Sequence, residues 1–149
     1  ANLTNTVTES NGNVDTVNFL AGTTPNGVAA GQLVTISDAT LKTINFVDAD
    51  KAVKGNIAAD KATELTINSG KVSLAGDAVV AAASATNISI NAEKGTAGMS
   101  LTAGKLTDLT VNNKGAFALT GSATALDSVK NLNVNAEGAF SVGTINSLK

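Results

Sequence analysis

The C-terminal half of the chain repeats one short unit four times. Each unit has an apolar-polar-apolar triplet followed by Asn, a short turn ending in Gly, and a second apolar-polar-apolar triplet. The units begin at Glu64, Asn87, Asp108 and Asn131. Alternation with a period of two is typical of β-strands, and glycine marks the turns between them. The unit is therefore predicted to contain two short strands rather than a helix.

The spacing of the units constrains the fold further. We take the first apolar residues of successive units to be Val17, Ile44, Leu65, Ile88, Leu109 and Leu132, which are 27, 21, 23, 21 and 23 residues apart. Self-similarity at a fixed period in this range is typical of solenoids. A strand rises ~3.3 Å per residue and paired strands lie ~4.8 Å apart, so one such unit suits one coil of two or three short strands. The sequence predicts an all-β fold, a right-handed parallel β-helix (β-solenoid) with about 21–23 residues per coil and about five or six coils.

Stacked coils place equivalent residues in columns. One inward column is predicted to hold Leu65, Ile88, Leu109 and Leu132, and the next Ile67, Ile90, Val111 and Val134. A column on the return side is predicted to hold Leu74, Leu101, Leu119 and Val142. Phe117 is expected to stack on Phe140, with Met99 and Val72 below them. A slip of one residue would turn each of these side chains to water, which specifies the register.

Asn and Gly residues recur at fixed places in the unit. Asn68, Asn91, Asn112 and Asn135 are predicted to form a column whose side chains hydrogen bond to one another, a structural role. The turn glycines Gly70, Gly95, Gly115 and Gly138 are expected to supply a positive φ. No G-x-G-x-x-G or P-loop spacing accompanies them, so they do not indicate a phosphate site.

We expect residues 1–149 to form a single β-solenoid with irregular coils at 1–40 and regular repeats at 41–149. Strands are expected near residues 4–8 and at 33–36, and the small residues Ala78 to Ala85 are read as a third side rather than a helix. The last residues, Asn146–Lys149, match the segment Asp127–Lys130 that precedes a strand. The chain is therefore expected to be part of a longer solenoid.

Composition removes several classes of function. The chain has no Cys and no His, which excludes disulfides, thiolate metal sites and the commonest general base. All ten cationic residues are Lys, the net charge is -2 and only 3% of residues are aromatic, so nucleic acid is not an expected partner. No apolar run approaches the roughly 20 residues that span a bilayer, and Ala1–Thr4 lacks the plan of a signal peptide.

Some β-solenoids act on glycans through a pair of carboxylates, and this chain offers one candidate pair. Glu64 and Asp108 are expected on the outer surface two coils apart, about 9–10 Å, near the upper end of the separation in inverting glycosidases. The chain offers no Arg for a uronate and no Tyr or Trp for a sugar ring. We therefore interpret these carboxylates as part of a solvated column and predict no enzymatic activity. Outward Thr residues suggest ice binding, but this column is expected to be mixed. Its predicted members are Thr16, Thr43, Glu64, Asn87, Asp108 and Asn131.

Asp48 and Asp50 share one loop with Lys51. Two carboxylates in a loop are candidate calcium ligands, since calcium prefers several oxygen ligands. A solvated turn is the favoured interpretation beside a lysine. The sequence assigns no catalytic, cofactor-binding or metal-binding residue.

The units L-T-I-N-S-G-K-V-S-L, L-T-V-N-N-K-G-A-F-A-L and L-N-V-N-A-E-G-A-F-S-V resemble the β-strand repeats of bacterial surface-layer proteins exported by the type I pathway. The resemblance covers roughly residues 41–149. It implies a structural, secreted protein that self-assembles in a lattice on the bacterial cell surface, with a possible cell-surface glycan partner and possible calcium dependence. The G-G-x-G-x-D calcium repeats of such proteins do not occur in this sequence.

Two other functions stay open. Autotransporter passengers and large adhesins carry similar repeats, so a stalk that faces host or neighbouring cells is the alternative. A glycan-active β-helix enzyme is the third reading.

Overall fold

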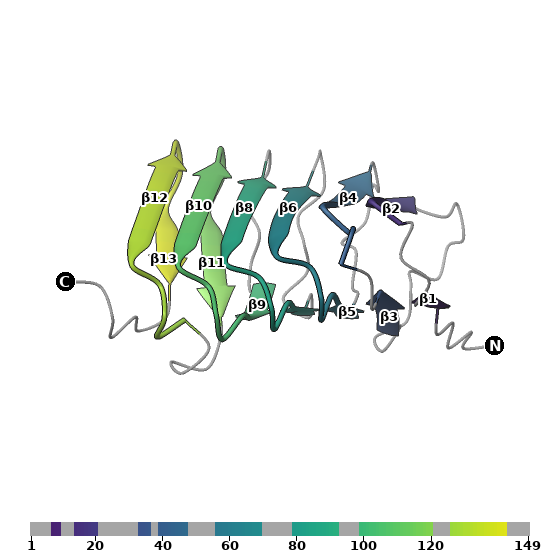
Figure 1. Ribbon diagram of the computed structural model, residues 1–149. Helices are drawn as coiled ribbons and strands as arrows, with labels where there is room; N and C mark the ends of the chain where they lie inside the picture. Colours follow the sequence, from purple (N-terminus) through teal and green to yellow (C-terminus); the bar gives the residue numbers. More distant parts are fainter. Residues whose placement is uncertain are drawn as a thin grey trace.

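The computed structural model describes residues 7–9, 14–20, 33–36, 39–47, 56–69, 79–92, 99–120 and 126–142. In these ranges the chain forms strands β1 to β13 and no helix. All strand pairs are parallel, and the chain alternates between two sheets (Figure 1). The all-β solenoid predicted from the repeat is confirmed.

Odd-numbered strands form a seven-stranded sheet in the order in which they occur in the chain. They are β1 (Val7–Glu9), β3 (Leu33–Ile36), β5 (Asn56–Ala58), β7 (Val79–Ala81), β9 (Met99–Thr102), β11 (Phe117–Thr120) and β13 (Phe140–Val142). Even-numbered strands form a six-stranded sheet. They are β2 (Thr16–Leu20), β4 (Thr43–Val47), β6 (Glu64–Ser69), β8 (Asn87–Ala92), β10 (Asp108–Asn113) and β12 (Asn131–Ala136).

The path of the chain is a right-handed coil. In Figure 1 the near strands β8, β10 and β12 point up and the far strand β11 points down, while the chain advances from the N-terminal to the C-terminal end. Each crossover therefore turns in the sense that parallel strand connections favour. The first strands, β1 to β3, belong to the same two sheets as the later repeats.

The core lies between the sheets and follows the predicted columns in the central coils. Strand β10 alternates between half-buried and buried residues, as period-two patterning requires. Leu65, Ile88 and Leu109 are in register on neighbouring strands and are buried. The same holds for Ile67, Ile90 and Val111. Apolar side chains on consecutive strands thus make one continuous interior, and this burial stabilises the solenoid.

One predicted register in the six-stranded sheet is wrong by two residues. Ile44 pairs with Ile67 rather than with Leu65, so the spacing at this step is 23 residues. A shift of two keeps inward residues inward, and the core pattern alone does not detect it. The observed register places Asn45 beside Asn68, where their amides hydrogen bond. The predicted register would have placed Asn45 beside Thr66.

The return sheet also differs from the prediction. Leu119 pairs with Val142 as expected, but on its other side it pairs with Met99 rather than Leu101. Leu101 pairs with Val80. The reason is loop length: residues 93–98 connect β8 to β9, whereas only residues 114–116 connect β10 to β11. Leu74 and Val72, predicted in these columns, lie outside the described residues.

The corner that leads into the six-stranded sheet is a repeated tight turn. In four coils, the backbone N–H of the last residue of the turn donates to the carbonyl of the residue three positions before it, at 3.0 to 3.3 Å. The paired residues are Ala62 with Ala59, Ala85 with Ala82, Leu106 with Ala103, and Val129 with Leu126, and all eight are buried. The segment Ala78 to Ala85 was predicted to be a third side rather than a helix. Its described residues form no helix, but strand β7 belongs to the seven-stranded sheet, so only the turn that follows it lies outside the two sheets.

The opposite corner brings two backbones close together. A Cβ added to Gly138 would lie 2.5 Å from the carbonyl carbon and oxygen of Gly115 in the coil below. The φ of Gly138 is outside the left-handed region, so the predicted reason for this glycine is wrong. Close stacking of the turns requires it instead. Directly after this corner Phe117 and Phe140 stack as predicted, with ring centroids 6.0 Å apart and an interplanar angle of 2°.

Candidate functional site

The outer surface of the six-stranded sheet carries two regular columns of polar residues, and we call it the asparagine face. One column is formed entirely by Asn residues in register: Asn18, Asn45, Asn68, Asn91, Asn112 and Asn135. From Asn112 back to Asn18, each Nδ2 donates to the Oδ1 of the preceding Asn at 2.8 Å. The predicted ladder is confirmed over Asn68, Asn91 and Asn112. It also extends to Asn45 and Asn18, which the sequence reasoning missed.

The neighbouring column carries mainly hydroxyl groups. It consists of Thr16, Thr43, Thr66, Ser89, Thr110 and Asn133. The expectation that Thr16 and Thr43 share a column with Glu64 and Asp108 is wrong, because the register of β4 is shifted by two residues. Strand spacing of ~4.8 Å and a two-residue repeat of ~6.6 Å make these two columns a two-dimensional array of neutral polar groups.

The acidic residues occupy a third column at the start of the strands. Glu64, Asn87, Asp108 and Asn131 are in register there, which places Glu64 and Asp108 two strands apart as predicted. Asp108 accepts hydrogen bonds from the Thr107 hydroxyl and from Asn131 Nδ2, each at 2.6 Å. With its amide oriented so that Nδ2 meets acceptors, Asn87 also donates to Asp108 at 3.2 Å.

These contacts favour the ionised form of the Asp108 carboxyl. Hydrogen bonds from Thr107 and Asn131 lower the pKa of the carboxyl below 3.8, Lys130 lowers it further, and desolvation opposes them. A glycosidase general acid needs the opposite, a carboxyl whose pKa is raised. The surroundings of Asp108 therefore suit an ionised side chain that accepts hydrogen bonds within a column.

Threonine hydroxyls make a further link between coils. Thr86 Oγ1 donates to the carbonyl of Thr63 at 3.3 Å, and Thr107 Oγ1 lies 3.1 Å from the carbonyl of Thr86, with its one proton shared between that carbonyl and Asp108. The sequence carries the signal, since each of these threonines lies two residues before the first inward residue of its strand. Backbone N–H groups bond to the same carbonyls at 2.8 and 2.9 Å.

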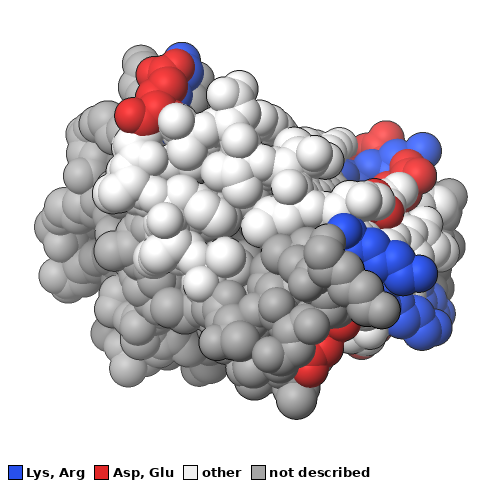
Figure 2. Space-filling model, turned by 90° about the vertical axis from the view of Figure 1, so that its left-hand side faces the viewer, with Lys and Arg blue, Asp and Glu red and all other residues white. Residues whose placement is uncertain are grey.

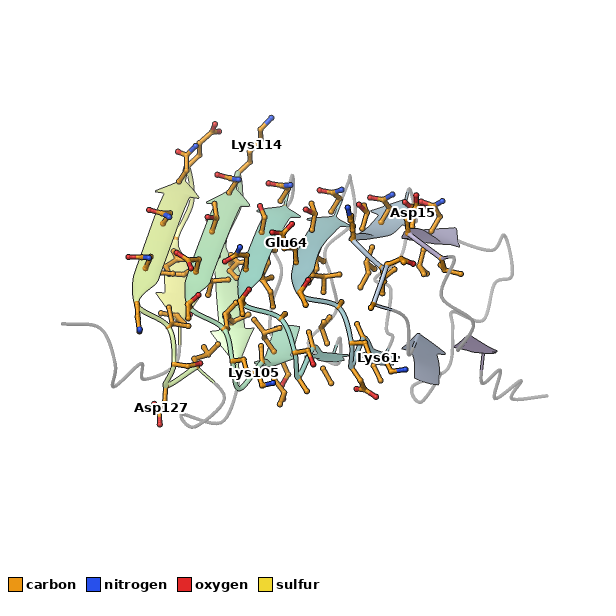
Figure 3. All side chains as sticks on the ribbon, viewed as in Figure 1. Asp15, Lys61, Glu64, Lys105, Lys114 and Asp127 are labelled. Carbon is orange, nitrogen blue, oxygen red and sulfur yellow. The ribbon has the colours of Figure 1, made fainter. Side chains whose placement is uncertain are left out.

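The asparagine face contains a depression at the C-terminal ends of strands β8, β10 and β12. It is lined by Asn91, Ala92, Asn112, Asn113, Lys114, Asn135 and Glu137. Figure 3 shows Lys114 extending from this end of the strands, while Lys61, Lys105 and Asp127 extend from the opposite corner. The depression thus combines amide groups with one cation and one anion, and these groups can hydrogen bond to a polar ligand.

Among the described residues, one polar side chain is buried inside the solenoid. Asn113 is 2% exposed and is in register with Ala92 and Ala136. Its Nδ2 donates to the carbonyl of Gly115, while its Oδ1 has no hydrogen-bond partner. The side chain thus braces the turn that leads to Phe117. The signal lay in the sequence, because Asn113 follows Leu109 and Val111 at a spacing of two, but the prediction did not use it.

The described residues contain no group of three or more acidic, His or Cys side chains close enough to share a metal ion. The candidate calcium ligands Asp48 and Asp50 lie outside those residues. No helix in the described part of the chain has the length and apolar character needed to cross a bilayer. Comparison with models of known protein families, with curated proteins and with solved structures gave no match.

Proposed function

We propose that this chain is a structural repeat domain of a secreted bacterial surface-layer protein that self-assembles on the cell surface. One observation carries the proposal: the conspicuous polar features are repeated from strand to strand and bonded along the solenoid. The Asn ladder uses its amides between strands, and Asp108 is held by neighbouring coils. Such an arrangement suits a rigid spacer or lattice element.

The experiment is electron microscopy of the parent protein on cells and after release from them, with and without calcium. The proposal expects the protein outside the cell and an ordered two-dimensional array. Loss of the array on calcium chelation is the further expectation from the family resemblance. An intracellular protein, or one that stays dispersed on the surface under both conditions, would contradict the proposal.

A stalk of an adhesin or autotransporter is the second candidate. The depression at the end of the asparagine face favours it, since amides beside Lys114 and Glu137 offer donors and acceptors for the hydroxyls of a glycan. A glycan array tests it, with Asn112→Ala expected to reduce any signal and Ser89→Ala as a control on the same face. Unchanged glycan binding by the Asn112→Ala variant would show that the depression is not the binding site.

The expectation that the chain is not an enzyme has its own test. A glycan-active solenoid would release reducing or unsaturated sugar and would lose that activity in Glu64→Gln or Asp108→Asn. We expect no release by the unmodified chain. Release that both substitutions abolish would replace the structural proposal with an enzymatic one.

A further inference from the structure

The middle of the asparagine face is an even surface. We call the outward Thr, Ser and Asn side chains of β4, β6, β8 and β10 the hydroxyl-amide array. Its members are Thr43, Thr66, Ser89 and Thr110 in one column and Asn45, Asn68, Asn91 and Asn112 in the other. All eight side chains are half-buried, so the exposure of the array is uniform. Each of the four strands has a partner on both sides, so this exposure does not depend on an end of the solenoid.

The array is neutral, and the charged residues lie beside it. Glu64 and Asp108 belong to the column at the start of the strands, and Lys114 follows the end of β10 (Figure 3). Figure 2 looks along the solenoid from its C-terminal end and shows Lys, Asp and Glu in separate groups at the margins of uncharged surface. The array therefore offers no charge to a charged partner. It also offers no aromatic ring to a single sugar chain, since the sequence has no Trp or Tyr.

The amides of the ladder keep part of their hydrogen-bonding capacity. An Asn side chain has two N–H donors and an oxygen with two acceptor lone pairs, and a hydroxyl has one donor and two acceptor lone pairs. The ladder uses one N–H and one lone pair of Asn68, and the same holds for Asn91. One donor and one acceptor position of each amide are left for solvent. Because every ladder bond is 2.8 Å long, the amides present the same pattern to water at each strand.

This pattern repeats in two directions. Neighbouring strands are ~4.8 Å apart, and the two columns are ~6.6 Å apart along the strands. Oxygen atoms in hexagonal ice repeat at similar distances along the two principal directions of the crystal. Water held on the array can therefore share the spacing of an ice surface. Threonine suits such a surface because its branched Cβ restricts χ1 and limits the positions of the hydroxyl.

A mixed outward column argued against ice binding, but the observed register places Thr43 beside Thr66 and leaves Glu64 in a separate column. We propose that the hydroxyl-amide array is an ice-binding surface, and that its partner is the ordered water lattice of an ice crystal. The ladder holds the amides in place beforehand, so little side-chain freedom is lost on binding. The inference goes beyond the surface-layer proposal and does not rest on it.

Ice recrystallisation in the presence of the 149-residue chain tests the proposal. The array spans only ~14 Å across its four strands, so we expect it to slow the growth of ice grains rather than to prevent freezing. Ser89→Lys places a long charged side chain in the middle of the array. Ser100→Lys is the matched control, because Ser100 is an equally half-buried outward serine on β9 in the other sheet. Grains should stay small with the unmodified chain and with Ser100→Lys, and should grow as in buffer with Ser89→Lys.

Urea unfolding of the two variants checks that both remain folded, and a second measurement needs no variant. When ice grows slowly from a solution of the unmodified chain, an ice-binding chain is taken into the crystal, whereas other solutes stay in the liquid. Exclusion from the ice, grains that grow as in buffer with the unmodified chain, or equal effects of the two substitutions would overturn the proposal. Retention on crystalline cellulose or chitin without uptake into ice would also overturn it, and would indicate a crystalline polysaccharide as the partner. Both measurements use the isolated chain, so their outcome is separate from that of the surface-layer test.

Discussion

The Asn ladder predicts an energetic coupling between residues 23 positions apart. Asn45 and Asn68 each make two ladder bonds, and they share one of them, from Asn68 Nδ2 to Asn45 Oδ1. Replacing either by Ala removes two bonds, whereas replacing both removes three rather than four. The double variant should therefore be less destabilised than the two single variants combined, by the value of the one shared bond.

A protein hydrogen bond contributes about 0.5–1.5 kcal/mol net, and these side chains are half-buried, so water recovers part of each lost bond. We expect each single substitution to destabilise the fold by about 1–2 kcal/mol. The coupling energy should be about 0.5–1 kcal/mol. Urea unfolding of the unmodified chain, the two single variants and the double variant, followed by far-ultraviolet circular dichroism, measures the coupling energy. The comparison requires that the unfolding free energies of the four proteins depend on urea concentration with the same slope.

The control pair is Asn45 and Asn112, which lie three strands apart on the same ladder and share no bond. Sites this far apart add to within about 0.3–0.5 kcal/mol. If the effects of the Asn45 and Asn68 substitutions were as additive as those of the control pair, the two amides would not share a hydrogen bond. That result would contradict the observed register of β4 against β6 and favour the predicted pairing of Ile44 with Leu65.

Three further predictions follow from core packing, turn packing and charge. Leu109→Ala should destabilise the fold by about 3–4 kcal/mol, and Leu132→Ala by about 1 kcal/mol, because only Leu109 has a coil on both sides; urea unfolding compares them. Gly138→Ala should cost about 1–3 kcal/mol through contact with the coil below, whereas Gly104→Ala, with nothing within 4 Å of the new Cβ, should be neutral or slightly stabilising. Asp108 has its pKa lowered below 3.8, so its ionised form stabilises the fold above that pH and this contribution is lost as the pH falls further; unfolding midpoints of Asp108→Asn should depend less on pH there.

Period-two alternation and a 21–23-residue repeat were sufficient to predict the fold class and the central columns. Both signals are strong between Leu65 and Val134, where each strand of the six-stranded sheet has six residues. Periodicity did not locate the register of β4, since a shift of two leaves the inward pattern unchanged. The informative signal was the Asn after Ile44, which matches the Asn after Ile67 in side-chain hydrogen bonding.

The return sheet was harder to predict for a different reason. Its strands β7 and β13 have only three residues each, and the loops before them differ in length. A short strand contributes few side chains that could pin its alignment. A longer loop at one corner can be offset by a shorter one at the other, as the pairing of Leu119 with Met99 illustrates. The spacing between repeats along the chain then gives the combined length of the two loops in a coil, but not the length of each loop.

Each interior strand has a partner on both sides, so its backbone groups, apolar side chains and ladder amides are satisfied by its own neighbours. On the described strands this leaves the outer columns to meet other molecules. The amides from Asn112 back to Asn18 are already bonded along the ladder, so a ligand on the asparagine face would meet only the donors and acceptors that the ladder leaves unused.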